Sequence, residues 1–224
     1  MIGSPEINKV LRRYLRPVLI ENGFDLIESR KGWGYKSPCV WTFGIRAVGS
    51  YFSDVTGWPP MSVSVSVGIY YQFIPWIVPR PLKVDSKGRL QPDIGDCHRK
   101  AQVYRSLDQS VYTSSLSHGP ERARRDLWWI EEDGSNVADV IENITFCVLE
   151  QGIPWLLENS DIERVFAVVE GEMDCLVKYQ TASAFARHLG NAEKHAHYQR
   201  LAGAEGQHLE ELFSRIRRPR QKRQ

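Results

Sequence analysis

The chain has 224 residues, of which 42% are hydrophobic and 25% are charged, and its formal net charge is +2. This composition is typical of a globular protein with a substantial core. No stretch approaches the roughly 18 apolar residues that span a bilayer, and the N-terminal "MIGSPEINKVLRRY" lacks the order of basic, apolar and small residues found in signal peptides. We therefore expect a cytoplasmic protein that does not enter a membrane.

The four cysteines are widely separated along the chain. They are Cys39, Cys97, Cys147 and Cys175. None belongs to the close C-x-x-C pairs that hold zinc or carry out thiol exchange. We therefore expect reduced thiols, most of them in the core.

The first predicted helix covers residues 5 to 21. Ser4 is suited to cap this helix and Pro5 to occupy its first turn. Gly23 is suited to end it, because glycine adopts the left-handed conformation that closes many helices. Apolar residues recur at helical spacing, at Ile7, Val10, Leu11, Tyr14, Leu15 and Val18. The pattern predicts an amphipathic helix.

Three stretches have the pattern of β-strands, at 41–47, 62–70 and 125–131. In the first, Trp41, Phe43 and Ile45 alternate with smaller or polar residues. In the second, "MSVSVSVGIYY", valines lie on one face and serines on the other. The third, "RRDLWWIEE", is apolar on both faces. We expect one face of the sheet to be core and the other to be small and polar.

Residues 75 to 120 form a long excursion in which the periodicity disappears. Prolines and glycines punctuate it, at Pro75, Pro79, Pro81, Gly88, Pro92, Gly95 and Pro120. Connections of this length in a compact domain are usually functional or mobile.

Helices are predicted again after the third strand, at 136–151 and 161–170. The second of these begins at "SDIE", residues 160 to 163, which matches a capping box. A helix, then strands, then helices favour an α+β fold, an antiparallel sheet covered on one face by helices. We expect this domain to cover 1–175, with a helical hairpin at 176–216, in which Asn191 caps the second helix, and a basic tail at 217–224.

Several of these segments resemble a bacterial domain-of-unknown-function family of small α+β proteins. The resemblance is carried by the leading helix "LRRYLRPVLIENGF", the strands "VWTFGI" and "MSVSVSVGIYY", and the "WWI" strand that leads to "QGIPWLLE". It covers roughly residues 5 to 172. It implies a lone N-terminal helix, a "GF" turn, an antiparallel sheet and C-terminal helices, and it implies no activity.

The sequence contains no G-x-x-x-x-G-K-[ST], no G-x-G-x-x-G after a strand, no H-E-x-x-H and no G-x-S-x-G motif. Asp96, Cys97 and His98 are neighbours in the long excursion, but adjacent side chains rarely converge as a nucleophile and its base. Glu193 and His197 would share a helix face, yet closed zinc sites need four ligands at short spacings. We expect no catalytic residue, no metal and no cofactor.

The charges are distributed unevenly along the chain. The regional balances are +8 for residues 1–125, −12 for 126–174 and +6 for 175–224. A strongly acidic region attracts a basic partner and speeds its association. The alternative is that these acids are solvated helix faces, or are paired with Arg122, Arg124, Arg125 or the basic first helix.

The third predicted strand places tryptophans beside three acids. Trp128 and Trp129 point to opposite faces, so one of them lies on the serine face. If that ring is partly exposed, an aromatic anchor with an acidic rim results, as in protein-binding hot spots. If the ring lies across the serines, or the 75–120 excursion covers it, it is core. The predicted partner-binding residues are Trp128, Trp129, Glu131, Glu132 and Asp133.

Two basic segments suggest a second class of partner. The first helix carries Lys9, Arg12, Arg13 and Arg16, and the tail carries Arg215, Arg217, Arg218, Arg220, Lys222 and Arg223. Such a tail binds phosphates nonspecifically or is solubilising.

Two function hypotheses follow. The first is a non-catalytic binding protein that neutralises a basic protein partner, as an immunity or antitoxin-like protein would. The second is a nucleic-acid-associated accessory factor, or an uncharacterised enzyme, that uses the 75–120 excursion or the basic tail.

Overall fold

The computed structural model describes residues 3–47, 62–75, 81–107, 125–131 and 133–217. The chain divides into two compact units. The first comprises residues 1–72 and 81–160, and the second comprises residues 73–80 and 161–224. The predicted domain boundary lay at 175. The predicted helix at 161–170 was therefore assigned to the sheet domain, whereas it belongs to the second unit.

The first unit is built on an antiparallel sheet, which has six strands among the described residues. The strands are β1 (Leu26–Glu28), β2 (Lys31–Lys36), β3 (Cys39–Ala47), β4 (Val63–Tyr71), β5 (Arg99–Val103) and β6 (Leu127–Trp128). Strands β1 to β5 follow one another in space as in sequence, and β6 also pairs with β4. The predicted strands at 41–47 and 62–70 are confirmed, and the predicted strand at 125–131 is reduced to two residues.

One face of the sheet is apolar because the strand alternation stays in register. Phe43 lies opposite Val67, and Ile45 lies opposite Val65. Val65 and Val67 are at most 1% exposed. The other face carries Thr42 and the strand serines, as the alternation predicts.

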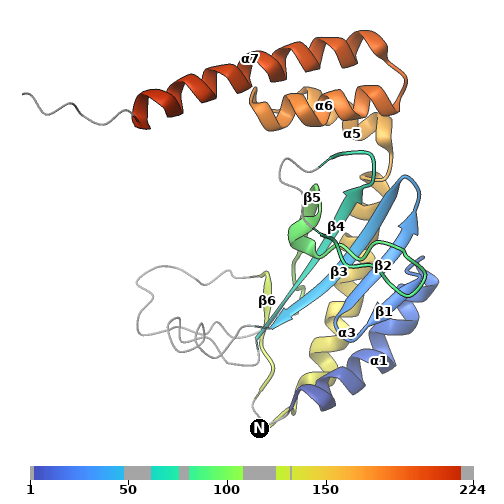
Figure 1. Cartoon of the computed structure of the whole chain (residues 1–224). Helices are drawn as coiled ribbons and strands as arrows, with labels where there is room; N and C mark the ends of the chain where they lie inside the picture. The colour runs from blue at the N-terminus through green and yellow to red at the C-terminus, as the bar shows by residue number, and fades with distance from the viewer. Residues whose placement is uncertain (1–2, 48–61, 76–80, 108–124, 132, 218–224) are drawn as a thin grey trace, which may run out of the picture. The chain divides into compact units, whose positions relative to one another are not determined.

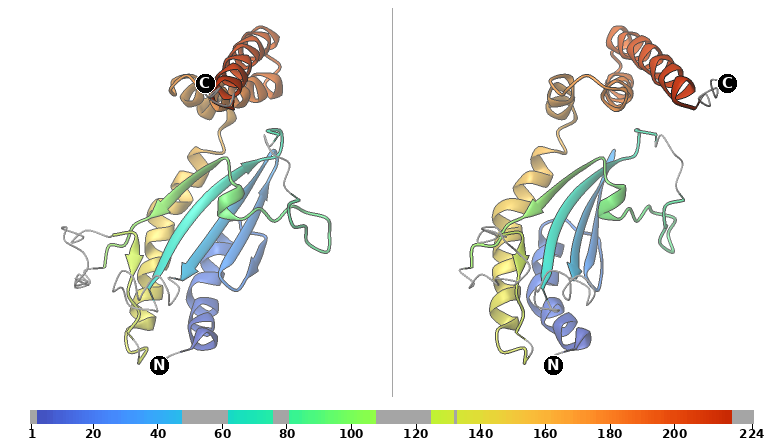
Figure 2. Two further views of the ribbon diagram at one scale, coloured as in Figure 1. Left: turned by 60° about the vertical axis from the view of Figure 1, so that its left-hand side comes forward. Right: turned by 90° about the vertical axis from the view of Figure 1, so that its left-hand side faces the viewer.

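Helices cover the apolar face of the sheet (Figure 1; Figure 2). They are α1 (Ser4–Glu21) and a continuous helical run made of α3 (Val137–Cys147), the π-helix η2 (Val148–Gly152) and α4 (Ile153–Glu158). Helix α1 buries Ile7, Leu11, Leu15 and Leu19, one residue per turn. At η2 a Cβ on Gly152 would lie 3.3 Å from Val67, so this glycine permits the close approach of helix and sheet.

The polar face is partly covered by the segment before β5. The carbonyl oxygen of Pro92 accepts hydrogen bonds from Trp33 Nε1 at 2.9 Å and from Thr42 Oγ1 at 3.4 Å. A short 3₁₀ helix, η1 (Ile94–Asp96), follows Pro92. Part of the predicted 75–120 excursion therefore forms ordered structure on the sheet, including β5, which the sequence pattern did not predict.

The second unit is helical in its described part. It contains α5 (Ile162–Glu170), α6 (Leu176–His188) and α7 (Ala192–Arg217). Helices α6 and α7 form the predicted hairpin, and the predicted cap is confirmed because Asn191 Oδ1 accepts the backbone N–H of Lys194 at 3.0 Å. The α+β fold class is confirmed. None of the helices in the described ranges is long and apolar enough to cross a bilayer.

Candidate functional site

Trp128 lies in the core beneath α3. Its partner in the sheet is Val63, which places the ring on the apolar face. The side chain is 0% exposed, and its Nε1 donates a hydrogen bond to Oδ1 of Asn143 at 2.9 Å. The ring is therefore a structural element between sheet and helix.

Trp129 is also buried, on the opposite side of the strand. Leu127 pairs with Ser64 on the serine face, and Trp129 clusters with Leu127 at 5% exposure. A tryptophan does lie on the serine face, as the alternation predicts, but it is not exposed. The partner-binding role predicted for Trp128 and Trp129 required an exposed ring, so we correct that interpretation: both rings are core.

Of the acids beside the tryptophans, Asp133 accepts a hydrogen bond in the turn that leads into α3. Glu131 and Asp133 are exposed, and Glu132 lies outside the described residues. The backbone N–H of Ser135 donates to Asp133 Oδ1 at 2.9 Å, and this hydrogen bond lowers the pKa of the Asp133 carboxyl. Negative charge here is also favourable because the positive end of a helix dipole lies next to it.

A different acidic surface lies along the solvent side of the α3–η2–α4 run. We call the exposed residues Asp139, Glu142, Phe146, Glu150 and Leu157 the acidic helix face. Each follows the previous one by whole turns, at intervals of three, four, four and seven residues. Phe146 is 53% exposed and Leu157 is 59% exposed. The arrangement is an exposed aromatic ring between carboxylates.

The carboxylates of this face have no counter-ion among the described residues. The ion pairs described in the chain join Lys31 to Asp93, Arg89 to Asp85, Lys178 to Asp174 and Lys194 to Glu170. Asp139, Glu142 and Glu150 take part in none of them. No ion pair among the described residues joins them to helix α1, and Arg122 and Arg124 lie outside the described residues.

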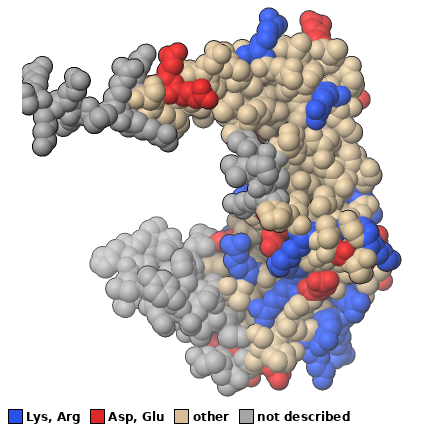
Figure 3. Space-filling view, viewed as in Figure 1, with Lys and Arg blue, Asp and Glu red and all other residues tan. Residues whose placement is uncertain are grey.

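A basic surface lies on α1 and the adjoining β1–β2 hairpin. Lys9, Arg12, Arg13 and Arg16 are all exposed, and blue atoms gather over this part of the first unit in Figure 3. Arg12 and Arg16 lie one turn apart on the side of α1 that faces the hairpin.

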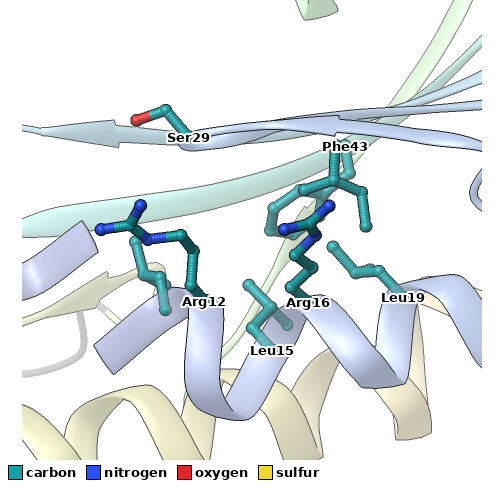
Figure 4. Close-up of a pocket in the computed structure, with 8 residues that line it drawn as sticks. Arg12, Leu15, Arg16, Leu19, Ser29 and Phe43 are labelled. Atoms are coloured by element: carbon teal, nitrogen blue, oxygen red, sulfur yellow. The ribbon is translucent and has the colours of Figure 1, made fainter. Parts of the chain in front are cut away.

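A narrow groove of about 40 Å³ separates these two arginines from the hairpin (Figure 4). Both arginine side chains extend from α1 toward the strands, and Ser29 stands at the hairpin turn above them. The remaining lining is apolar and consists of Leu11, Leu15, Leu19, Ile27 and Phe43. The groove therefore combines cationic walls with an apolar floor.

A second cavity, of about 210 Å³, opens on the polar face of the sheet. Lys31 and Asp93 form an ion pair at its rim, 2.5 Å long. The two hydroxyl groups in its lining are already used as donors, Thr42 to Pro92 and Ser66 to Gln102. Lys31 and Arg46 add cationic donors to the lining and Asp93 adds a carboxylate, so the cavity presents charges of both signs.

Cys97 and His98 do not form an activated pair. Burial raises the pKa of the Cys97 thiol to about 12, and its Sγ donates to the carbonyl oxygen of Asp93 at 3.5 Å. His98 instead uses Nδ1 to accept the backbone N–H of Tyr71 at 3.0 Å. A protonated thiol and a ring nitrogen held by the backbone lack the arrangement of a nucleophile and its base.

Two of the C-terminal histidines, His188 and His197, make ring contacts. The ring of His188 stacks on Phe73 at 4.1 Å, and that of His197 meets Tyr198 edge-on at 5.1 Å. Over the described ranges no three His, Cys, Asp or Glu side chains group as metal ligands. Of the predicted tail residues, Arg215 and Arg217 belong to α7, whereas Arg218, Arg220, Lys222 and Arg223 lie outside the described residues.

Comparison of the chain with protein-family models, with curated proteins and with solved structures gives no match. The resemblance to a bacterial family of small α+β proteins remains an expectation. Conclusions about function therefore depend on the surfaces described above.

Sequence reasoning missed Phe146, although a signal was present. In the helix predicted at 136–151, Val140, Ile141 and Ile144 recur at helical spacing. Phe146 falls outside this apolar stripe, between Glu142 and Glu150. A large apolar residue on the polar side of an amphipathic helix indicates a contact beyond the helix's own core.

Proposed function

We propose that the chain is a non-catalytic cytoplasmic protein that binds a basic protein segment through the acidic helix face. The observation that carries the proposal is Phe146, a half-exposed aromatic ring framed by Glu142 and Glu150, which have no ion-pair partner among the described residues. Aromatic anchors with charged rims are typical of binding hot spots. The four cysteines, all free thiols, are consistent with a reducing compartment.

Charge complementarity defines the occupant of this surface. The acidic region from 126 to 174 holds a single basic residue, Arg164, against 13 acids. A partner that places lysines or arginines on both sides of an apolar contact would match Asp139, Glu142 and Glu150 while covering Phe146. The carboxylates would raise the association rate, and the ring would supply most of the binding energy.

Capture from a cell extract with purified variants tests the proposal. Three variants are compared with the wild type: Phe146→Ala, the double variant Glu142→Lys/Glu150→Lys, and a control double variant, Glu193→Lys/Glu210→Lys, on exposed positions of α7. We expect a basic protein to be captured by the wild type and the control, and to be lost with both other variants. Phe146→Ala should weaken the purified interaction by about 2 kcal/mol or more.

Kinetics then separate the contributions of charge and ring. Removal of the carboxylates should slow association and flatten its salt dependence, whereas removal of the ring should speed dissociation. An acidic captured protein, or equal capture by all four proteins, would rule the acidic helix face out. Capture of further copies of the chain alone, through the basic α1 of a second molecule, would also contradict the proposal.

A further inference from the structure

Two arginines on α1 lie over the groove against the β1–β2 hairpin without an acidic partner. Arg12 Nε donates to the backbone oxygen of Asn8 at 3.2 Å, one turn earlier in the same helix. Arg16 has neither a hydrogen bond nor an ion pair within the described ranges. Most of the donor capacity of the two guanidinium groups is therefore unused.

The nearest acid in sequence on the hairpin points away from the groove. Ile27 lies opposite Gly32 and lines the groove, and the next residue, Glu28, lies opposite Lys31 on the polar face. Gln91, which belongs to the segment before β5, contacts Glu28 on that face at 3.5 Å. The acids of α1, Glu6 and Glu21, are near its two ends. The middle of the helix thus carries uncompensated positive charge.

The far wall of the groove is fixed in position. Ser29 is the only non-glycine residue with a positive φ in the described part of the chain, at 53°. Arg30 holds the turn against α1, because its Nε donates to Asn8 Oδ1 at 3.1 Å and its Nη2 to Ser4 Oγ at 3.4 Å. Strained backbone that neighbouring contacts hold in place is often found at binding sites. Ser29 is exposed, and its hydroxyl points away from the two arginines (Figure 4).

The size of the groove limits what it accommodates. Its 40 Å³ correspond to a few water-sized positions at roughly 10–15 Å³ each. A tetrahedral oxyanion fits this space. Arginine forks bind phosphate oxygens in pairs.

We propose that this groove binds one phosphate group, either free phosphate or the terminal group of a small phosphate monoester. Arg12 and Arg16 donate to its oxygens from α1. Lys9 and Arg13 lie outside the groove and contribute a long-range field. The apolar floor of Leu15 and Phe43 excludes water beneath the bound group and strengthens both charge-assisted bonds. The site is independent of the acidic helix face.

The test is a titration of the isotope-labelled protein with inorganic phosphate and with glycerol phosphate, followed by NMR at constant ionic strength. We expect saturable shifts of the amides of Ile27 and Ser29. Arg12→Gln and Arg16→Gln should each weaken binding about tenfold, the loss of one charge-assisted hydrogen-bond pair. Arg13→Gln is the matched control, with the same change of charge on the same helix, and should change affinity by less than about twofold.

The two titrants distinguish the two sources of the phosphate. Tighter binding of glycerol phosphate assigns the site to a monoester, and equal or weaker binding assigns it to free phosphate. A shift that does not saturate, or an equal loss of affinity in Arg13→Gln, overturns the proposal. Binding of an oligonucleotide that depends equally on Lys9, Arg12, Arg13 and Arg16 also overturns it, because that result identifies a nonspecific polyanion surface.

Chemical modification of the wild-type protein gives an independent test. Phenylglyoxal modifies accessible arginines, and the modified residues are identified by mass spectrometry. Phosphate should protect Arg12 and Arg16 and leave Arg13 reactive. Equal protection of the three, or protection of none, contradicts a site in the groove.

Discussion

The indole Nε1 of Trp128 and the side-chain oxygen of Asn143 are joined by a 2.9 Å hydrogen bond that links β6 to α3. The same Asn143 oxygen accepts the backbone N–H of Leu107 at 3.3 Å, and its Nδ2 donates to Ser106 Oγ at 2.8 Å. The Asn143 side-chain amide therefore connects β6, α3 and the segment after β5 through hydrogen bonds. This network explains why a tryptophan lies at this position in the chain.

Trp128→Ala should destabilise the first unit by about 3 to 5 kcal/mol, because it removes a fully buried ring and leaves a cavity. Phe146→Ala, on α3 in the same unit, is the comparison and should cost less than about 1 kcal/mol, because that ring is half exposed. Urea unfolding monitored by circular dichroism gives both free energies. Equal losses for the two variants would show that Phe146 contributes to the core, which would also remove it as a partner anchor.

Gly68→Ala should destabilise the sheet by about 1 to 3 kcal/mol through overpacking. A Cβ at this position would lie 2.7 Å from Cys97 Sγ, 2.8 Å from Cys97 Cβ and 3.2 Å from the carbonyl oxygen of Arg99. Gly95→Ala, in the segment that crosses the same face, meets nothing within 4 Å and should change stability by less than about 0.5 kcal/mol. Thermal melts compare the two. A tolerated Gly68→Ala would mean that the segment through Cys97 does not pack closely on β4.

The central strands and the first helix could be predicted because each has a single strong periodicity. The valine–serine alternation of β4 and the one-per-turn leucines of α1 require one buried face, and the structure has it. Strand β5 was missed because "RKAQV" buries only Val103 and depends on its pairing with β4. Such long-range pairing leaves little trace in a local pattern.

The candidate sites were harder to predict, because burial depends on what lies above each face. The alternation correctly predicted that one of the two tryptophans lies on the serine face, but it did not show which one, and no local pattern shows whether such a ring is covered. The groove beside Arg12 and Arg16 depends on the β1–β2 hairpin, which the sequence analysis did not predict as a pair of strands. The N-cap of α5 shows the same limit on a smaller scale. The capping box "SDIE" predicted Ser160 as the N-cap, whereas Asp161 is the N-cap and its Oδ1 accepts the backbone N–H of Arg164 at 3.1 Å.

Because of His98, the free energy of unfolding of the first unit should decrease as the pH is lowered from 6.5 to about 4. Burial lowers the pKa of this ring to about 4 from an ordinary value of 6.5. The unfolded chain therefore binds a proton in this interval that the folded chain does not bind, so stability is complete above pH 6.5 and decreases below it. The loss is at most roughly 3 kcal/mol. Protonation of Nδ1 would also break its hydrogen bond with the backbone N–H of Tyr71.

His98→Asn isolates this contribution, since the asparagine oxygen can accept the same backbone N–H but does not titrate. Urea unfolding at a series of pH values should give a flatter profile for this variant than for the wild type. His208→Asn, at an exposed position on α7, controls for the loss of a histidine and should keep the wild-type profile. A variant profile as steep as that of the wild type would show that other groups cause the acid loss.

In the second unit, Glu170 joins α5 to α7 and should make its stability sensitive to acid. Tyr198 Oη donates to one carboxylate oxygen at 2.9 Å, and Lys194 Nζ donates to the other at 2.7 Å. Burial raises the pKa of Glu170, but the two hydrogen bonds and the charge of Lys194 outweigh it, so the pKa lies below its ordinary value of 4.5. A lowered carboxyl pKa stabilises the fold above that value, and the stabilisation disappears as the pH falls through the folded pKa.

Tyr198→Phe should cost about 1 to 2 kcal/mol at neutral pH, because it removes a hydrogen bond to a charged acceptor while keeping the ring between the helices. Lys194→Met should cost less than about 1 kcal/mol, because the ammonium group is half exposed. The double variant should lose less stability than the wild type between neutral and acid pH, since the donors that lower the Glu170 pKa are gone. Far-UV circular dichroism during urea unfolding measures these changes, with exposed Glu193→Gln as the control. If the double variant and the wild type lost equal stability on acidification, the hydrogen bonds to Glu170 would not contribute to the acid sensitivity of the second unit.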